Sequence, residues 1–525
     1  MFFVIVSILY IVNGYASLAT NDDWALQNML AAKGIYGTLI MSYPLSYFMS
    51  HLYDYFPTFQ WYSILLTLVM GINFYFISLY IVKNDSFIQK IVLVVLASLW
   101  MTSLWFNMSI TSLTLSTMLI ATGLIKRNLL LSFALIFLAF LLRTDVMIMF
   151  MPYYTVSYFI LRDKLSFTKK EILAAILLIL LITFSLLMQK QDKSYNDWST
   201  FNKARSAIVD TGMMNVKKDF FSPEEYFCTQ AAWFQDPQLL PSEKLIKSTP
   251  SFIDIYLHKL PHFHFIHYIQ THKFKYWFFL LLIASLLVVL VNIKNRKSIF
   301  ILFFILGFFL LMVIRDVDRV TVPLIMLWAY VLFESLKSYR KVNSIFLFLF
   351  TALFFYYISG QLEYRYFKEI TTAKKEARQL IKSSNKVCEV SLNYPTSANI
   401  QLSLIFLYNF LFHEDTWLKM NDKEILPTGW LSRHPIFYKT HHMSDTATKR
   451  KYDTYYEYLI DEHTAFIGGR MLINDKGFNM YLLGAYDKLY LKDKPYCKHK
   501  IFIVAESEYF AISQIRVDCN TTKKK

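Results

Sequence analysis

The sequence predicts an α-helical protein that crosses a membrane many times and carries a small α/β domain at its C-terminal end. Its 525 residues are 55% hydrophobic and only 18% charged, whereas soluble globular domains average about 25% charged residues. Several apolar runs approach the roughly 20 residues that a helix needs to cross a bilayer. Basic residues gather in the short gaps between these runs, as they do in cytoplasmic loops.

The apolar runs, taken in order, predict about eleven transmembrane helices. We expect them near residues 2–18, 61–82, 87–105, 107–125, 128–143, 146–162, 172–189, 276–293, 298–314, 320–336 and 343–360. A bundle over residues 1–360 and a separate domain over residues 361–525 follow from this division.

The basic loops predict which side of the membrane each gap faces. If the N-terminus is cytoplasmic, every compact basic cluster falls inside: Lys83, Lys126 with Arg127, 162–170, 294–297 and 337–341. Three larger regions then lie outside, namely residues 19–60, 190–275 and 361–525. Residues 1–19 could instead be a cleaved signal peptide, but they lack a basic start. Either way the chain from residue 20 emerges outside.

The cysteines agree with this topology. The chain has four, Cys228, Cys388, Cys497 and Cys519, all in the regions expected outside the cytoplasm, where disulfides are permitted. Four cysteines allow three pairings, and buried free thiols are an equal alternative. The net charge of +16 is accounted for by the cytoplasmic loops and the C-terminal third. No nucleic-acid-binding motif accompanies it, so nucleic acid is not an expected partner.

An acidic pair, Asp22 and Asp23, directly follows the first span. Ionisable residues beside a bilayer are costly and commonly functional. Residues 25–34 have helical apolar spacing with Gly34 as a stop, and residues 44–55 form a second amphipathic stretch, so two helices should lie along the outer surface. The alternative is that the pair only caps the first of these helices.

Two further charged turns are expected on the outer face. Arg143 and Asp145 lie between the fifth and sixth spans, and 315–319 (Arg315, Asp316, Asp318, Arg319) between the ninth and tenth. Carboxylates can accept a proton from a hydroxyl or hold a divalent cation, and arginine binds phosphate with a planar fork of donors. Local ion pairs in tight turns are the simpler interpretation of each cluster alone.

The remaining outer regions carry weaker signals. Histidines crowd into 258–272, but their spacing does not match HExxH and Pro261 interrupts a helix, so a metal site is not favoured. Strand-like runs at 387–392, 501–504 and 512–517, with a helix at 363–384, predict the small mixed α/β domain.

This organisation resembles the GT-C class of membrane glycosyltransferases, which includes protein O-mannosyltransferases and the aminoarabinose transferases of lipid A. Residues 10–62 are more narrowly similar to the serotype-converting glucosyltransferases of bacterial O-antigen. The motifs that carry this are Asn21-Asp22-Asp23-Trp24, Tyr43-Pro44-Leu45-Ser46 and Phe56-Pro57.

The resemblance implies a bacterial inner-membrane enzyme with its active site and C-terminal domain in the periplasm. The donor would be a polyprenyl-phosphate sugar, such as glucose, and the acceptor a lipid-linked surface polysaccharide such as the O-antigen of lipopolysaccharide. It implies Asp22 or Asp23 as catalytic base or metal neighbour, leaving open a divalent cation such as Mg²⁺ or Mn²⁺. Arg315, Arg319 or Arg143 would hold the donor phosphate, with Asp145, Asp316 and Asp318 in support.

Three other functions compete with this prediction. A polysaccharide polymerase or ligase would be expected to place functional arginines in a large late outer loop. A lipid-linked sugar transporter or flippase would carry charges or Gly and Pro breaks at mid-span, and the whole chain has only 13 Gly and 13 Pro. A non-catalytic assembly protein would bind through its outer domain.

Overall fold

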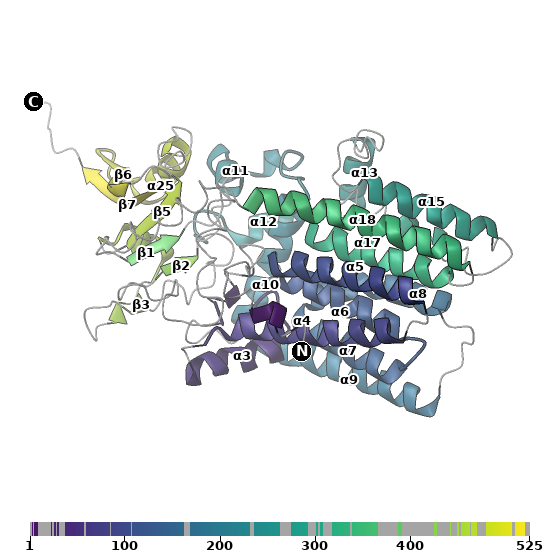
Figure 1. The fold of residues 1–525 in the computed structure, drawn as a ribbon. Coiled ribbons are helices and arrows are strands. Elements are labelled where there is room, and N and C mark those ends of the chain that lie inside the picture. Colours follow the sequence, from purple (N-terminus) through teal and green to yellow (C-terminus); the bar gives the residue numbers. More distant parts are fainter. Residues whose placement is uncertain are drawn as a thin grey trace, which may run out of the picture.

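A computed structural model describes the bundle, most of the outer loops and the C-terminal strands (Figure 1). The described residues are 3, 5–8, 23, 26, 27, 29, 30, 37–56, 59–83, 86–106, 108–161, 168–230, 236–262, 275–291, 301, 302, 305–307, 318–336, 339–365, 387–390, 425–427, 441, 442, 449, 450, 453–462, 464–469, 479–506 and 510–519.

Helices run side by side over most of the predicted spans (Figure 1). They are α4 (Trp61–Val82), α5 (Phe87–Phe106), α6 (Ile110–Leu124), α7 (Leu129–Leu142), α8 (Thr144–Leu161), α9 (Lys169–Gln191), α15 (Lys275–Val291), α17 (Asp318–Ser335) and α18 (Arg340–Arg365). The predicted spans at 2–18 and 298–314 lie largely outside the described residues.

The length and composition of these helices are those of a multi-pass membrane protein. Within the described residues, four are long and apolar enough to cross a bilayer: residues 61–82, 87–105, 169–191 and 341–359. Shorter apolar helices at 110–124, 129–142, 276–290 and 320–335 accompany them. The full set of eleven spans stays a prediction.

Helix α6 is the centre of the bundle. Its residues 110–119, 121 and 122 are buried, and it packs against α4, α7, α8 and α17. Four of its buried hydroxyl groups donate hydrogen bonds to carbonyl oxygens one turn earlier, as Thr114 does to Ile110 at 2.7 Å, so these four donors are satisfied within the core. By contrast α9 exposes most of its apolar side chains, which suits a helix that faces lipid.

Charged and aromatic contacts fix one end of the bundle. The Tyr80 hydroxyl of α4 donates to Glu334 of α17 at 2.7 Å, and Lys126, just after α6, lies 3.5 Å from the same carboxylate. The Arg127 guanidinium stands 4.8 Å from the centre of the Tyr80 ring. The ends of α4, α6 and α17 therefore meet where Lys83 also lies, the end expected to be cytoplasmic.

At the opposite end, short helices cover the bundle. They are α3 (Tyr43–Tyr55), α10 (Lys193–Arg205), α11 (Pro223–Gln230), α12 (Ser242–Ser248) and α13 (Phe252–His262), with a π-helical turn at Ser206–Asp210 and a 3-10 turn at Lys218–Phe220. Helix α3 confirms that the second predicted amphipathic stretch, residues 44–55, is helical, and its place on the outer membrane surface stays a prediction. In the first predicted surface helix and just before it, residues 23, 26, 27, 29 and 30 are helical, whereas Gly34 lies outside the described residues.

The C-terminal strands form a mixed five-stranded sheet in the order β2-β1-β5-β7-β6. They are β1 (Val387–Val390), β2 (Ile425–Pro427), β5 (Thr464–Gly469), β6 (Cys497–Glu506) and β7 (Phe510–Cys519), with α22 (Tyr455–Ile460), α25 (Gly484–Tyr490) and a π-helical turn at Asn479–Leu483 nearby; a separate ribbon pairs β3 (His441–His442) with β4 (Lys449–Arg450). Strand β1 is parallel to β2 and β5, whereas β7 is antiparallel to β5 and β6. The strands predicted at 387–392, 501–504 and 512–517 are confirmed, whereas the helix predicted at 363–384 is described only where α18 reaches Arg365.

The β6–β7 hairpin is closed by a disulfide between Cys497 and Cys519. These residues face each other in the antiparallel register. The structure thereby supplies a pairing that the sequence alone could not decide. Cys228 is a buried free thiol. Because disulfides persist in oxidising compartments, the bond indicates an extracytoplasmic location for the hairpin.

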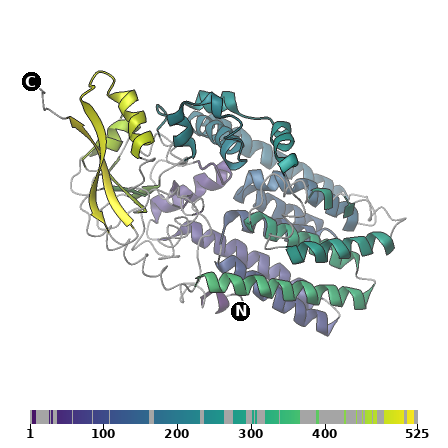
Figure 2. The ribbon, with the colours of Figure 1, turned by 90° about the horizontal axis from the view of Figure 1, so that it is seen from above.

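The short helices beside the hairpin, together with the π-helical turn at Asn479–Leu483, pack on α11 and on the residues that follow it (Figure 2). Cys228 and Leu239 from this part of the chain share a buried cluster with Tyr458 and Tyr486. The Tyr490 hydroxyl donates to the Gln238 side chain at 2.6 Å, and Lys488 pairs with Glu224. The domain division at residue 360 stays a prediction.

Candidate functional site

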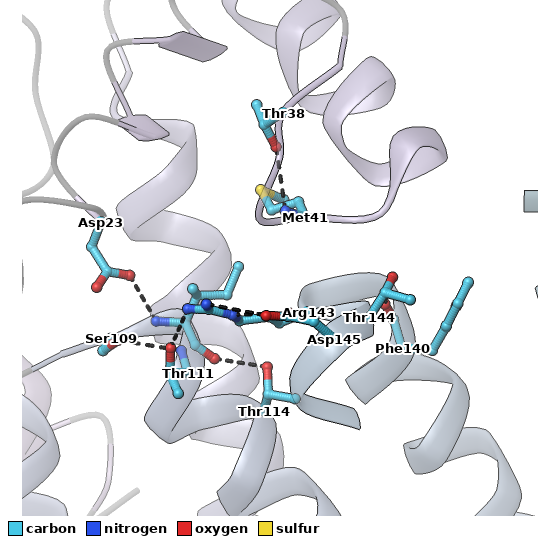
Figure 3. A network of polar contacts seen from close by, with 11 residues as sticks. Asp23, Thr38, Met41, Ser109, Thr111, Thr114, Phe140, Arg143, Thr144 and Asp145 are labelled. Atoms are coloured by element: carbon cyan, nitrogen blue, oxygen red, sulfur yellow. Dashed lines mark hydrogen bonds and ion pairs between the residues drawn. The ribbon is translucent and has the colours of Figure 1, made fainter. Parts of the chain in front are cut away.

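The candidate site lies at the N-terminal end of α6 (Figure 3). Ser109 caps this helix, its hydroxyl accepting a hydrogen bond from the Thr111 amide at 3.2 Å. Beside the cap, Oδ1 of Asp23 accepts one hydrogen bond from the Ile110 amide at 2.8 Å and another from the Tyr62 hydroxyl at 2.6 Å. The positive end of the helix dipole also favours a carboxylate here.

Asp23 is held by a second layer of contacts. The backbone amide of Tyr62, near the start of α4, donates a hydrogen bond to the Tyr53 hydroxyl of α3 at 3.0 Å. Gln27, one turn after Asp23, donates to Gln60. The first outer loop, α3 and α4 are thereby joined, and Asp23 is only 1% exposed. Asp23 thus acts as a cap for α6.

Arg143 lies on the other side of the same helix start. Its guanidinium meets the Asp145 carboxylate through Nε at 3.1 Å and through a terminal nitrogen at 3.3 Å, while the other terminal nitrogen donates to Thr111 Oγ1 (Figure 3). The Arg143 side chain is 18% exposed and that of Asp145 is 65% exposed. Asp23 and Arg143 are both close enough to the Tyr62 hydroxyl to act on it electrostatically.

Helices α3 and α10 cover this end. The Ser42 amide, at the start of α3, donates to the Leu141 carbonyl at 3.0 Å, and the Tyr43 ring meets Tyr195 of α10 edge-on at 6.0 Å. Burial raises the pKa of Tyr195, and the negative charge of Asp145 raises that pKa further. Tyr195 therefore stays protonated, with its ring in the neighbourhood of Asp145.

Two tyrosine rings lie so close to the backbone at position 37 that they leave no room for a side chain, which explains the glycine there. A Cβ at this position would lie 2.9 Å from ring atoms of both Tyr43 and Tyr195. A larger residue would push apart the two rings that cover the site.

The arrangement offers two kinds of chemistry at one end of the bundle. It has a buried carboxylate held by donors, and a partly exposed guanidinium fork backed by an exposed carboxylate. Arginine binds phosphate well, because its planar guanidinium holds its donors in fixed directions. An exposed carboxylate such as Asp145 can accept a proton from a hydroxyl.

The other predicted site residues are described less fully. Asp22, Arg315 and Asp316 lie outside the described residues, and Asp318 and Arg319 are the first residues of α17 without described side chains. The structure thus brings Asp23 to the same helix start as Arg143 and Asp145, and their convergence with residues 315–319 stays a prediction. Sequence reasoning missed Tyr62 and Thr111; the Ser109-Ile110-Thr111 cap pattern was the available signal.

No group of three or more His, Cys, Asp or Glu side chains suited to a metal ion occurs among the described residues. Of the histidine-rich stretch, His258 is described, on the exposed side of α13, whereas 263–274 lies outside the description. Oδ1 of Asp23 already accepts hydrogen bonds from two donors. We therefore assign no metal-binding role to the described residues of the site.

Comparison of the chain with models of protein families, with curated proteins and with solved structures gives no significant match. The function must therefore be inferred from the chemistry of the residues.

Proposed function

We propose that this protein is a membrane glycosyltransferase. It transfers a sugar, glucose in the closest resemblance, from a polyprenyl-phosphate donor to a lipid-linked surface polysaccharide such as O-antigen. The reaction takes place on the periplasmic face of a bacterial inner membrane. The observation that carries the proposal is the meeting of Asp23, Arg143 and Asp145 at the start of α6.

The position of these groups matches the substrates. The site lies where helices end and a covering layer begins, so a lipid-bound phosphate could reach it from the bilayer and a polysaccharide from the aqueous side. Arg143 keeps part of its surface exposed while Asp145 and Thr111 hold its fork. A held guanidinium loses little freedom when a phosphate binds, and so binds it more tightly.

The chemical step is one displacement. A carboxylate takes the proton from an acceptor hydroxyl, the hydroxyl oxygen forms a bond to the anomeric carbon, and the bond from that carbon to the phosphate oxygen breaks. Polyprenyl phosphate leaves with the electron pair, and its negative charge is stabilised by Arg143 and, as the sequence suggests, by Arg315 or Arg319. A single displacement inverts the anomeric centre.

The two aspartates receive different roles in the proposal. Asp23 is buried and its Oδ1 already accepts two hydrogen bonds, so it is a positioning residue that holds the loop on α6. Asp22, its neighbour in sequence, is then the first choice for the base. Asp145 is the second choice, because its carboxylate is exposed beside Arg143.

Chemical analysis of surface polysaccharide, with and without the gene, tests this function. We expect one additional sugar substituent per repeat unit in cells that carry the gene, and its loss when Asp22 is changed to Asn. Asp54→Asn is the matched control, because Asp54 is an exposed aspartate of α3 in the same outer region. Identical polysaccharide with and without the gene would contradict the proposal, provided the protein is found in the membrane.

A further inference from the structure

A second feature of the bundle lies at the end opposite the candidate site. A cavity of about 350 Å³ opens among α4, α5, α6, α17 and α18. That volume falls in the range of small-molecule sites, which is roughly 300–1,000 Å³. None of the candidate site residues lines it, so it is separate from that site.

The walls of the cavity are apolar over most of their length. Leu96 and Trp100 come from α5, Leu119 from α6, and Phe346 and Phe350 from α18. Gly123, which has no side chain, and Ala97, which has a single methyl group, also line the cavity and leave space in it. Such a chamber suits a hydrocarbon chain, because the free energy falls when apolar surface leaves water or fills a void.

Cationic residues line the same cavity at the expected cytoplasmic surface. Arg127 and Lys83 are both exposed and both belong to its lining. Within the described part of the chain neither forms an ion pair, and Arg127 stacks over the Tyr80 ring. The nearby Glu334 carboxylate is instead bonded to Tyr80 and Lys126. The rim therefore presents positive charge where a lipid headgroup would lie.

We propose that this cavity binds an anionic phospholipid of the cytoplasmic leaflet. One acyl chain lies among α4, α5 and α6, and the phosphate meets Arg127 and Lys83. The charge of the rim complements a phosphate, and basic pockets between transmembrane helices on the cytoplasmic side are known to hold anionic headgroups. The inference does not depend on sugar transfer, so either proposal can fail without the other.

The test is native mass spectrometry of the full chain with phosphatidylglycerol, and with phosphatidylethanolamine of the same acyl chains. We expect phosphatidylglycerol to remain bound to a larger fraction of the protein than phosphatidylethanolamine does. Arg127→Gln should weaken its binding about tenfold, as expected for loss of a charge-assisted hydrogen bond. Lys170→Gln, an exposed lysine of α9 at the same membrane surface, should leave binding unchanged.

Variants that fill the cavity test the acyl chain separately. Ala97→Trp should reduce binding, whereas Val94→Trp should not, because Val94 is an exposed residue one turn away on α5 outside the cavity lining. Gly123→Leu is a second filling variant if Ala97→Trp does not fold. Gly123→Ala controls for folding, since its Cβ would stand an ordinary 3.5 Å from the Tyr330 hydroxyl.

Three results would overturn the assignment. Equal binding of the two phospholipids, unaffected by Arg127→Gln, would show a non-specific lipid contact. Displacement by water-soluble glycerol phosphate alone would show that the site binds a free phosphate. Polyprenyl phosphate binding much more tightly than phosphatidylglycerol would identify a different lipid as the occupant.

Discussion

Asp23 and Ile110 are 87 residues apart in the sequence, yet the carboxylate of one accepts a hydrogen bond from the backbone amide of the other at 2.8 Å. This bond fastens the first outer loop to the start of the most buried helix in the bundle. It also places Asp23 at the same helix start as Arg143, which contacts the next residue of that helix, Thr111. The position of Asp23 is therefore set in part by a contact with the central helix.

Removal of the Asp23 carboxylate should destabilise the bundle. Asp23→Ala leaves the Ile110 amide and the Tyr62 hydroxyl without this acceptor, and each unsatisfied buried donor costs about 1–3 kcal/mol. We expect the free energy of unfolding to fall by roughly 2 kcal/mol or more, seen as a lower melting temperature in detergent. Asp23→Asn, which keeps an oxygen acceptor, should lose less. Equal melting temperatures for Asp23→Ala and the exposed-site control Asp54→Ala would show that the cap is unimportant.

Both the planar fork of Arg143 and its charge should matter for activity. Arg143→Lys keeps the charge but cannot reproduce the double contact with Asp145 together with the bond to Thr111. If Arg143 stabilises the leaving phosphate, Arg143→Gln should lower the transfer rate about 100-fold or more, with Arg143→Lys in between. Lys203→Gln, an exposed lysine of α10, is the control. Full activity of Arg143→Gln in a transfer assay would remove this residue from the mechanism.

The disulfide should stabilise the C-terminal hairpin. A bond that closes a loop of this size, with a sequence separation of 22 between the two cysteines, should contribute about 2–4 kcal/mol. The double variant Cys497→Ser, Cys519→Ser should therefore expose the hairpin to protease at a lower temperature. The wild-type chain should also migrate faster on a non-reducing gel than on a reducing one. Rapid labelling of Cys497 by a thiol reagent in the untreated protein would be incompatible with the bond.

The stability of the region around His499 should depend on pH. Burial lowers the pKa of His499 below its ordinary value of 6.5, although Asp487, 2.7 Å away, partly opposes this. The neutral ring accepts a hydrogen bond from Tyr456 at 2.8 Å. As pH falls below about 6.5, the unfolded chain takes up a proton that the folded form does not.

Stability should accordingly be constant above pH 6.5, fall on acidification, and level off below the folded pKa. Melting temperatures measured between about pH 5 and 8 should show this loss, and His499→Gln should flatten the curve. The exposed His258→Gln is the matched control. An unchanged slope in His499→Gln would assign the pH dependence to another group.

Much of the fold could be predicted from the sequence because hydropathy acts locally. The spans at 61–82 and 172–189 have helices at nearly the predicted bounds, since an apolar run of membrane length has few other structures available. The Arg143–Asp145 ion pair could also be predicted, because only one residue stands between the two in the sequence.

The rest depends on contacts that sequence spacing does not encode. The cap pattern at Ser109 predicts where α6 begins, but not that Asp23 comes from a distant loop to meet it. Likewise, the choice of Cys497 and Cys519 among three possible pairings follows from the hairpin register, which brings those two residues opposite each other.

Transfer by the purified protein tests the central claim most directly. The full chain is reconstituted in vesicles with a polyprenyl-phosphate-linked radiolabelled glucose and lipid-linked polysaccharide, and label in the polysaccharide is measured over time. We expect transfer by the wild-type protein and by Asp54→Asn, and none above background by Asp22→Asn. No transfer by the folded wild-type protein, or undiminished transfer by Asp22→Asn, Asp23→Asn and Asp145→Asn alike, would contradict the account.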